Sequence, residues 1–135
     1  MARLEMIKSI GETHCRLLRE TCQINSVAAL LRAGATRDER GALAERLGVP
    51  SVVVLGWVNQ ADLTRVKGIG QEYLILLDAV GIGTLEHLKR QTAESLHGKM
   101  EELNGNDHIV RRLPTLEMVS DWVEQANEMC PTVQE

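Results

Sequence analysis

Hydrophobic positions recur every three or four residues along most of the chain, the spacing that one face of an α-helix produces. Leu side chains occupy neighbouring helical turns within residues 16–22 and 72–80, and each stretch follows a glycine that suits a tight turn. No stretch alternates convincingly between apolar and polar residues, as a half-buried strand would. The pattern predicts an all-α protein.

Polar residues that favour helix starts divide this pattern into separate helices. Ser26 and Thr84 are each suited to cap a short helix. Thr36 opens a Thr-Arg-Asp-Glu capping box, and the helix after it is expected to run to about Leu47 and to stop at Gly48. Further helices are expected to begin at Pro50-Ser51, Thr92 and Pro114-Thr115.

Two segments differ from the simple helical pattern. Residues 52–55 read Val-Val-Val-Leu, and their β-branched side chains are also typical of a strand. Their place between a capping Ser51 and Trp57 favours a buried helix, with a strand as the alternative. Residues 104–108 read Asn-Gly-Asn-Asp-His and predict an enlarged loop, because these residue types favour turns.

The chain also repeats itself. Residues 4–11 align with residues 63–70, and Trp-Val-Asn-Gln-Ala at 57–61 matches Trp-Val-Glu-Gln-Ala at 122–126. Because both ends of the unit are preserved, the sequence predicts two tandem helical repeats, each with a second helical pair after its opening hairpin. The expected bounds are about 4–61 and 63–126, with a tail at 127–135, all in a single compact domain over 1–135.

Composition and charge limit the kinds of partner. The only aromatic residues are Trp57, Trp122 and Tyr73, which leaves few platforms for stacking the bases of a single strand. Residues 1–61 carry eight Lys and Arg against six Asp and Glu, and residues 62–135 carry seven against thirteen, for a net charge of −4. This is not the dense positive field of a protein whose affinity comes from phosphate neutralisation.

Cysteine usage and hydropathy point to a reduced compartment. Cys15, Cys22 and Cys130 fit no paired metal spacing, and the first two are expected to be small core residues. No apolar run approaches the roughly 18 residues of a membrane span, and the N-terminus lacks a signal-peptide core. We therefore expect a cytoplasmic protein with no membrane role.

Residues 63–77 resemble the helix-hairpin-helix motif, in which two helices flank a Gly-hydrophobic-Gly turn. Gly68 and Gly70 allow a tight turn, and Ile69 is expected to plug that turn into the core. The amides that start the next helix would then point outward with the positive end of its dipole, which suits a phosphate. Each repeat is thus predicted to be a helix-hairpin-helix-like unit followed by a second helical pair.

By this resemblance the contacts with a nucleic-acid backbone would be Gly68, Ile69 and Gly70, with Lys67 and Arg65 as flanking cations. Such contacts do not depend on base sequence.

Two departures from the motif set limits on this prediction. Glu72 stands at the helix start, where its carboxylate satisfies the dipole and repels phosphate. In the first copy, Ser9 stands in place of the first glycine, and Glu12 follows the turn. At most the hairpin at 68–70 is therefore expected to contact nucleic acid. The alternative is that this hairpin serves only to reverse the chain between two helices and binds nothing.

Residues 41–58 superficially resemble a bacterial helix-turn-helix. The helix that would read bases carries Val52, Val53, Val54 and Leu55, with no Arg, Asn or Gln to meet base edges. Binding to a specific operator is not expected.

Over nearly its full length the chain is similar to an uncharacterised bacterial family known as domain of unknown function 4332, which is related to helix-hairpin-helix proteins. The resemblance rests on residues 61–77, 79–85, 96–97 and 111–122. It implies a paired-hairpin fold and an affinity for nucleic acid, without an established activity.

Catalytic and metal-binding patterns are missing from the sequence. His14, His87, His97 and His108 form no pair of metal ligands at helical spacing, and His97 is expected to cap or pack. Cys15 beside His14 is no nucleophile-base pair, because neighbours in a helix point about 100° apart. No enzyme activity, metal or cofactor is expected.

Arg111 and Arg112 form the most compact cationic spot of the chain. They either bind an anion or pair with neighbouring carboxylates. The sequence as a whole predicts a non-enzymatic module that binds duplex nucleic acid weakly and without sequence specificity. The alternative is a protein-interaction adaptor or a self-associating scaffold with no role in nucleic-acid binding.

Overall fold

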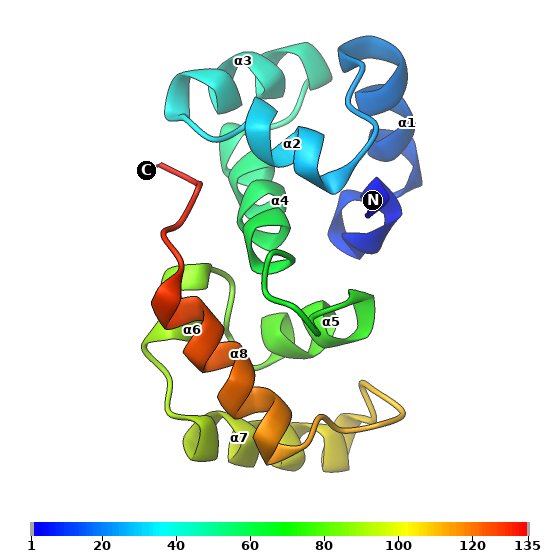
Figure 1. The fold of residues 1–135 in the computed structure, drawn as a ribbon. Helices are drawn as coiled ribbons and strands as arrows, with labels where there is room; N and C mark the ends of the chain where they lie inside the picture. The colour runs from blue at the N-terminus through cyan, green and yellow to red at the C-terminus, as the bar shows by residue number, and fades with distance from the viewer. Residues whose placement is uncertain (1, 135) are drawn as a thin grey trace. The chain divides into compact units, whose positions relative to one another are not determined.

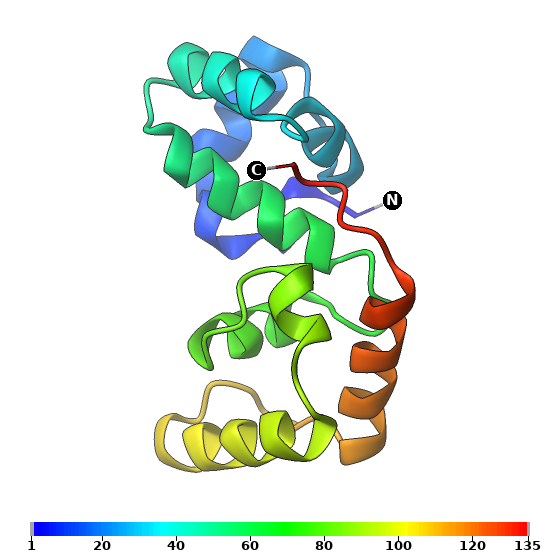
Figure 2. The same cartoon turned by 90° about the vertical axis from the view of Figure 1, so that its left-hand side faces the viewer.

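The computed structural model describes residues 2–134, and its regular structure is entirely helical there (Figures 1 and 2). The prediction of an all-α protein is confirmed. Contacts divide the chain into two compact units, Met1–Asp62 with Thr132–Glu135 (unit 1) and Leu63–Pro131 (unit 2). No single helix in the described residues is long and apolar enough to cross a membrane; α3 and α4 pass that test only jointly, with a 117° bend between them.

Unit 1 contains the 3-10 helices η1 (Leu4–Met6) and η2 (Lys8–Ile10), then α1 (Glu12–Cys22), α2 (Val27–Ala33), α3 (Arg37–Leu47) and α4 (Ser51–Leu63), whose last residue opens unit 2. Two predicted caps are confirmed: Ser26 accepts a hydrogen bond from the Ala29 amide, and Thr36 accepts one from the Glu39 amide. Gly48 ends α3 in the left-handed conformation, with φ of 70°. This local chemistry explains why the sequence breaks into helices where it does.

The core of unit 1 is aliphatic around one tryptophan. Leu4, Ile7, Leu18 and Leu30 are fully buried, and Trp57 of α4 is 3% exposed. Residues 52–55 lie inside α4, so the helix is confirmed there and the strand alternative is wrong. The expected burial is wrong for Val52 and Val53, which are exposed, while Val54 is buried.

Residues 132–134 pack on unit 1 as an extended segment. The Gln134 amide donates a hydrogen bond to the Ala35 carbonyl oxygen at 2.7 Å, and the Thr132 amide donates one to the buried side chain of Asp62 at 3.1 Å. The stretch that the sequence marks only as a tail thus ends in a segment with partners of its own.

Arg40 of α3 is buried, with 4% of its surface exposed. Its Nη1 donates hydrogen bonds to the carbonyl oxygens of Gly34 at 2.9 Å and Ala35 at 3.0 Å, and its Nη2 donates one to Gln134. Because burial of a charge is costly without such partners, these backbone dipoles compensate the guanidinium. Arg40 thereby ties the C-terminal segment to α3.

Unit 2 contains α5 (Gln71–Ala79), α6 (Leu85–Lys89), α7 (Ala93–Asp107) and α8 (Leu116–Glu128). The predicted caps Thr84, Thr92 and Thr115 each accept a hydrogen bond from an amide in the first turn of α6, α7 and α8. Helix α8 packs against both α6 and α7 (Figure 2). Leu85, Leu88, Leu96, Met100, Val119 and Trp122 are buried among these helices.

The prediction of a loop at residues 104–108 is wrong. Helix α7 continues through Asp107 and ends at His108, which adopts the left-handed conformation with φ of 49°. The His108 amide donates to the Asn104 carbonyl oxygen, and the Asn104 side chain accepts a hydrogen bond from the Val110 amide. His108 therefore takes the left-handed position that Gly or Asn usually occupies after a helix, and Asn104 and Gly105 lie within the last turn of α7.

Candidate nucleic-acid interface at the hairpins

The hairpin of unit 2 connects Leu63 to the start of α5. The Val66 amide donates to the Leu63 carbonyl oxygen at 3.1 Å, and the Ile69 amide donates to that of Val66 at 3.3 Å. Ile69 is 4% exposed, so its predicted role as the plug of the turn is confirmed. Gly68 has φ of 100°, a conformation that side chains rarely adopt.

Trp122 of α8 lies directly against this turn. A Cβ on Gly68 would stand 2.9 Å from Trp122 Nε1, closer than real Cβ atoms come. The Trp122 ring also lies against Tyr73 of α5, with 5.2 Å between ring centroids. Packing of Trp122 on the turn is therefore a reason for glycine at position 68, independent of any ligand.

Gln125 of α8 binds the backbone of the same turn. Its carbonyl oxygen accepts a hydrogen bond from the Lys67 amide at 2.8 Å, and its amide donates to the Lys67 carbonyl oxygen at 3.0 Å and to Asp121 at 2.8 Å. The Lys67 amide is thus occupied, while the Lys67 side chain is exposed. Arg65, the other predicted flanking cation, donates from Nη1 to the Cys130 carbonyl oxygen at 2.9 Å.

The start of α5 differs from that of most other helices. Gly70 is its N-cap and supplies no side-chain hydrogen bond, and apart from its two chain neighbours no described residue comes within 4 Å of the place a Cβ would take. Helices α2, α3, α6, α7 and α8 instead begin on Ser or Thr, whose hydroxyl accepts a first-turn amide. An anionic oxygen could take the place of that missing hydroxyl at α5. Glu72 is exposed in the first turn.

The hairpin of unit 1 has a related set of contacts. Helix α1 begins on Gly11, which has φ of 83° and supplies no cap. Ser9 donates a hydrogen bond to Gln60 of α4 at 3.1 Å, and the Trp57 ring lies 5.3 Å from that of His14. Positive φ occurs at Gly11 and not at Ser9, so the backbone of this turn does not require glycine at position 9.

The helices that carry Trp and Gln were not predicted to hold the hairpins. Trp122 and Gln125 in unit 2, and Trp57 and Gln60 in unit 1, all contact the turn or the helix after it. The signal was present in the sequence as the shared Trp-Val-x-Gln-Ala segment, whose spacing places Trp and Gln on one helix face.

Charge around the unit 2 hairpin is unfavourable to a strong anion site. Unit 2 carries seven Lys and Arg against eleven Asp and Glu. A phosphate at α5 would meet the Glu72 carboxylate as well as the Lys67 ammonium. Any affinity for a phosphate backbone at this position is therefore low.

Arg111 and Arg112 lie in the loop between α7 and α8, and both are exposed. Neither guanidinium forms an ion pair with any residue of the described range 2–134. The Arg112 carbonyl oxygen accepts a hydrogen bond from the Tyr73 hydroxyl at 3.3 Å. Pairing with neighbouring carboxylates, one of the two predicted roles, does not occur in this structure.

His97 and Cys15 take part in packing, whereas the expectation that Cys22 is a core residue is only partly met. His97 contacts the Pro114 carbonyl oxygen through Nε2 at 2.9 Å and Glu101 through Nδ1 at 3.1 Å, as the predicted packing role requires. Cys15 is buried, which raises the pKa of its thiol, whereas Cys22 is half-buried and Cys130 is exposed. No group of three His, Cys, Asp or Glu within residues 2–134 is arranged to hold a metal.

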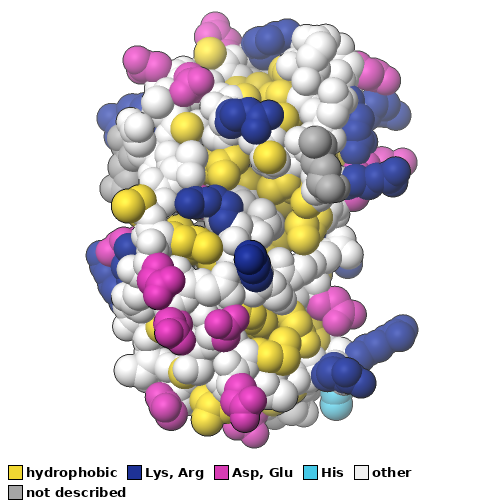
Figure 3. Space-filling model, viewed as in Figure 1, with side chains coloured by type: hydrophobic (Ala, Val, Ile, Leu, Met, Phe, Trp, Pro, Cys, Tyr) yellow, Lys and Arg dark blue, Asp and Glu magenta, His cyan; other side chains and the backbone are white. Residues whose placement is uncertain are grey.

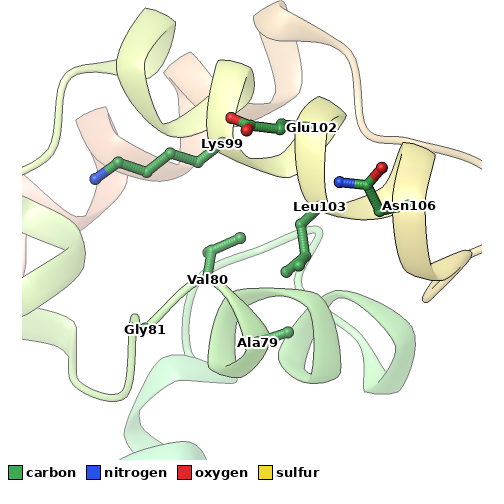
Figure 4. Close-up of a pocket in the computed structure, with 7 residues that line it drawn as sticks. All are labelled: Ala79, Val80, Gly81, Lys99, Glu102, Leu103 and Asn106. Carbon is green, nitrogen blue, oxygen red and sulfur yellow. The ribbon is translucent and has the colours of Figure 1, made fainter.

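A shallow pocket of about 450 Å³ lies between the end of α5 and helix α7 (Figure 4). Val80 and Leu103 face each other across it, while Lys99 extends away from them along α7. Glu102 and Asn106 complete the α7 side. Its ionisable side chains are Lys99 and Glu102, and the residues that line it include no Ser, Cys or His.

The exposed face of α4 offers nothing to read bases. Its exposed residues are Ser51, Val52, Val53 and Gly56. A recognition helix needs side chains that hydrogen-bond base edges, so this face does not suit sequence-specific readout.

Comparison with known proteins places the chain in one family. Neither a curated protein nor a solved structure matches it significantly. The model of the family described as a domain of unknown function (DUF4332) matches residues 8–129, which include the turn at 68–70 and both tryptophan helices. The chain belongs to this DUF4332 family.

Proposed function

We propose that this protein is a non-enzymatic module that binds the backbone of duplex nucleic acid weakly and without sequence specificity. The observation that carries the proposal is the N-cap of α5, where Gly70 supplies no side-chain hydrogen bond and the place of its missing Cβ is open. The exposed Lys67 side chain is the nearest cation in the sequence on that hairpin. Amides at a helix start with a cation beside them suit a phosphate.

The proposed contact is smaller than the whole hairpin. Ile69 is buried, and Gln125 occupies the Lys67 amide. The exposed backbone of Gly68, the start of α5 at Gly70 and the Lys67 side chain are left to meet a phosphate. A contact of this size, close to Glu72, accounts for binding that is weak.

We further propose that the two units are tandem copies of one helix-hairpin-helix-like unit. Trp57 lies on His14 as Trp122 lies on Tyr73, and His14 and Tyr73 are each the third residue of the helix after the hairpin. Each copy also has a Gln, three residues after the Trp, that binds the turn. Independent packing solutions would not be expected to reuse equivalent positions.

Two variants of equal size test the phosphate contact. Because the space at Gly70 is open, Gly70→Glu and Gly70→Gln should both fold, and they differ only in charge. We expect Gly70→Glu to bind a random-sequence duplex about three- to tenfold more weakly than Gly70→Gln at low salt. Equal binding by the two variants, or no binding by the wild type at low salt, contradicts the proposal.

A second candidate function, a protein-interaction adaptor, is favoured by the apolar surface of α4. Val52 is 69% exposed and Val53 is 37% exposed, and the two are adjacent. Sedimentation of the wild type and of Val52→Ser over a range of concentrations tests self-association through this face. A species that stays monomeric at high concentration in both proteins counts against a self-associating scaffold.

A further inference from the structure

The loop between α7 and α8 is fixed at three points. The Val110 amide donates to the Asn104 side chain at 2.9 Å, and the Tyr73 hydroxyl donates to the Arg112 carbonyl oxygen at 3.3 Å. At its far end the Pro114 carbonyl oxygen contacts His97 Nε2 at 2.9 Å. A loop held in this way loses little conformational freedom when it binds a ligand.

This fixed loop presents two cations that lack acidic partners. Arg111 and Arg112 are adjacent and exposed, and no ion pair joins either of them to the part of the chain that the structure describes. Two other cations of unit 2, Lys89 and Arg90, do have an acidic partner, since both pair with Glu86, at 3.9 and 3.5 Å. Two unpaired guanidinium groups in a unit with an excess of carboxylates point to a ligand that is itself anionic.

The loop lies beside the first turn of α5. Tyr73 is the third residue of that helix, and its hydroxyl is the group that holds Arg112. Figure 3 shows Lys and Arg side chains projecting into solvent at the loop between α7 and α8, at the lower right of the view. The first turn of α5 thus has Gly70 at its start, and at Tyr73 it contacts the loop that carries Arg111 and Arg112.

We propose that Arg111 and Arg112 form a second contact with the phosphodiester backbone, next to the contact at Gly70. This inference rests on the proposed function and extends it to a second site. A guanidinium can give two parallel hydrogen bonds to one phosphate, which an ammonium cannot do. Two neighbouring phosphates of one strand would then be held by the loop and a further one by the start of α5.

The salt dependence of duplex binding tests this proposal. The logarithm of the binding constant falls with the logarithm of the salt concentration, and each phosphate contact contributes about 0.9 to the steepness of that line. The double variant Arg111→Gln with Arg112→Gln (the loop variant) should therefore have a slope that is less steep by about 1.8. The control carries Arg90→Gln with Lys99→Gln, which changes the charge of unit 2 equally but lies outside both contacts. We expect the control to change the slope by less than half as much. An unaltered thermal midpoint of the loop variant shows that its fold is intact.

The possible results separate the two proposals. If the loop variant and the control have equal slopes while Gly70→Glu still weakens binding, the arginine contact is wrong and the α5 contact stands. If the wild type binds no duplex at low salt, both are wrong. Polyglutamate is the second probe. If the wild-type protein binds polyglutamate through this loop more strongly than it binds duplex, the arginine contact with phosphate is also wrong, because the ligand of the loop is then an acidic peptide.

Discussion

Gln125 binds both backbone groups of Lys67: it accepts a hydrogen bond from the Lys67 amide at 2.8 Å and donates one to the Lys67 carbonyl oxygen at 3.0 Å. These bonds connect α8 to a turn 58 residues earlier in the chain. The turn of unit 2 is therefore held by a helix that follows it at long range, and not by its glycines alone.

Removal of this clamp should destabilise the protein. We expect Gln125→Ala to lower the free energy of unfolding by about 1–2 kcal/mol, because its two hydrogen bonds to Lys67 and one to Asp121 are lost at a partly solvated site. Urea unfolding measures the change. Gln91→Ala is a matched control, since the Gln91 side chain makes one local bond to His87. An equal, small effect of both variants would show that Gln125 does not hold the turn.

Substitution by alanine should destabilise the protein strongly at Gly68 and hardly at all at Gly70. Gly68→Ala places a Cβ against Trp122 and forces φ of 100° on a side-chain-bearing residue, so we expect a loss of at least about 2 kcal/mol. Gly70→Ala meets open space at φ of −103°, and its effect should stay within about 0.5 kcal/mol. Thermal and urea unfolding of both variants check this. Similar losses at the two positions would contradict the packing role of Gly68.

Arg40 should be essential for the stability of unit 1. Arg40→Met keeps a long side chain but removes the guanidinium that donates to the carbonyl oxygens of Gly34, Ala35 and Gln134. The Ala35 oxygen keeps its other hydrogen bond, from the Gln134 amide. We expect a loss of about 2–4 kcal/mol, and faster proteolysis near residues 132–134. Arg37→Met, on the same helix but exposed, is the control and should be nearly neutral. A stable Arg40→Met variant with a protected C-terminal segment would refute this role.

The ion pair between Glu5 and Arg19 predicts a specific pH dependence. The hydrogen bond from the Arg19 guanidinium, 2.6 Å long, lowers the pKa of Glu5 to about 2. A carboxylate with a lowered pKa stabilises the folded state above its unfolded value of 4.5, and this contribution is lost as the pH falls towards 2. Because the pair is exposed, the effect should be small.

Thermal midpoints at several pH values test this contribution. Between pH 4.5 and about 2, the midpoint of Glu5→Gln should fall less than that of the wild type. Parallel curves for the two proteins would show that the pair adds nothing to stability in this range.

Local sequence signals were sufficient to predict most helix boundaries. Ser26, Thr36, Thr84 and Thr115 all cap helices as predicted, because the capping hydroxyl binds an amide only three residues away. The error at residues 104–108 has a local cause too. Asn and Gly favour helix ends as well as loops, and composition alone does not distinguish the two.

Contacts over long range could not be predicted in the same way. Nothing near Arg40 in the sequence indicates burial, since its partner Gln134 lies 94 residues away. The contact of Gln125 with Lys67 likewise depends on how α8 packs. The repeated Trp-Val-x-Gln-Ala segment showed that these positions matter, but only packing shows that they hold the hairpin turn.

The proposed phosphate contact at the start of α5 is tested most directly by amide NMR. A short random-sequence duplex is titrated into the labelled protein at low salt, and the shifts of the backbone amide signals are followed. We expect the largest shifts at Gly70, Gln71 and Glu72, and their loss in Gly70→Glu but not in Gly70→Gln. Absence of shifts at these three amides, or shifts confined to α4, would contradict the account.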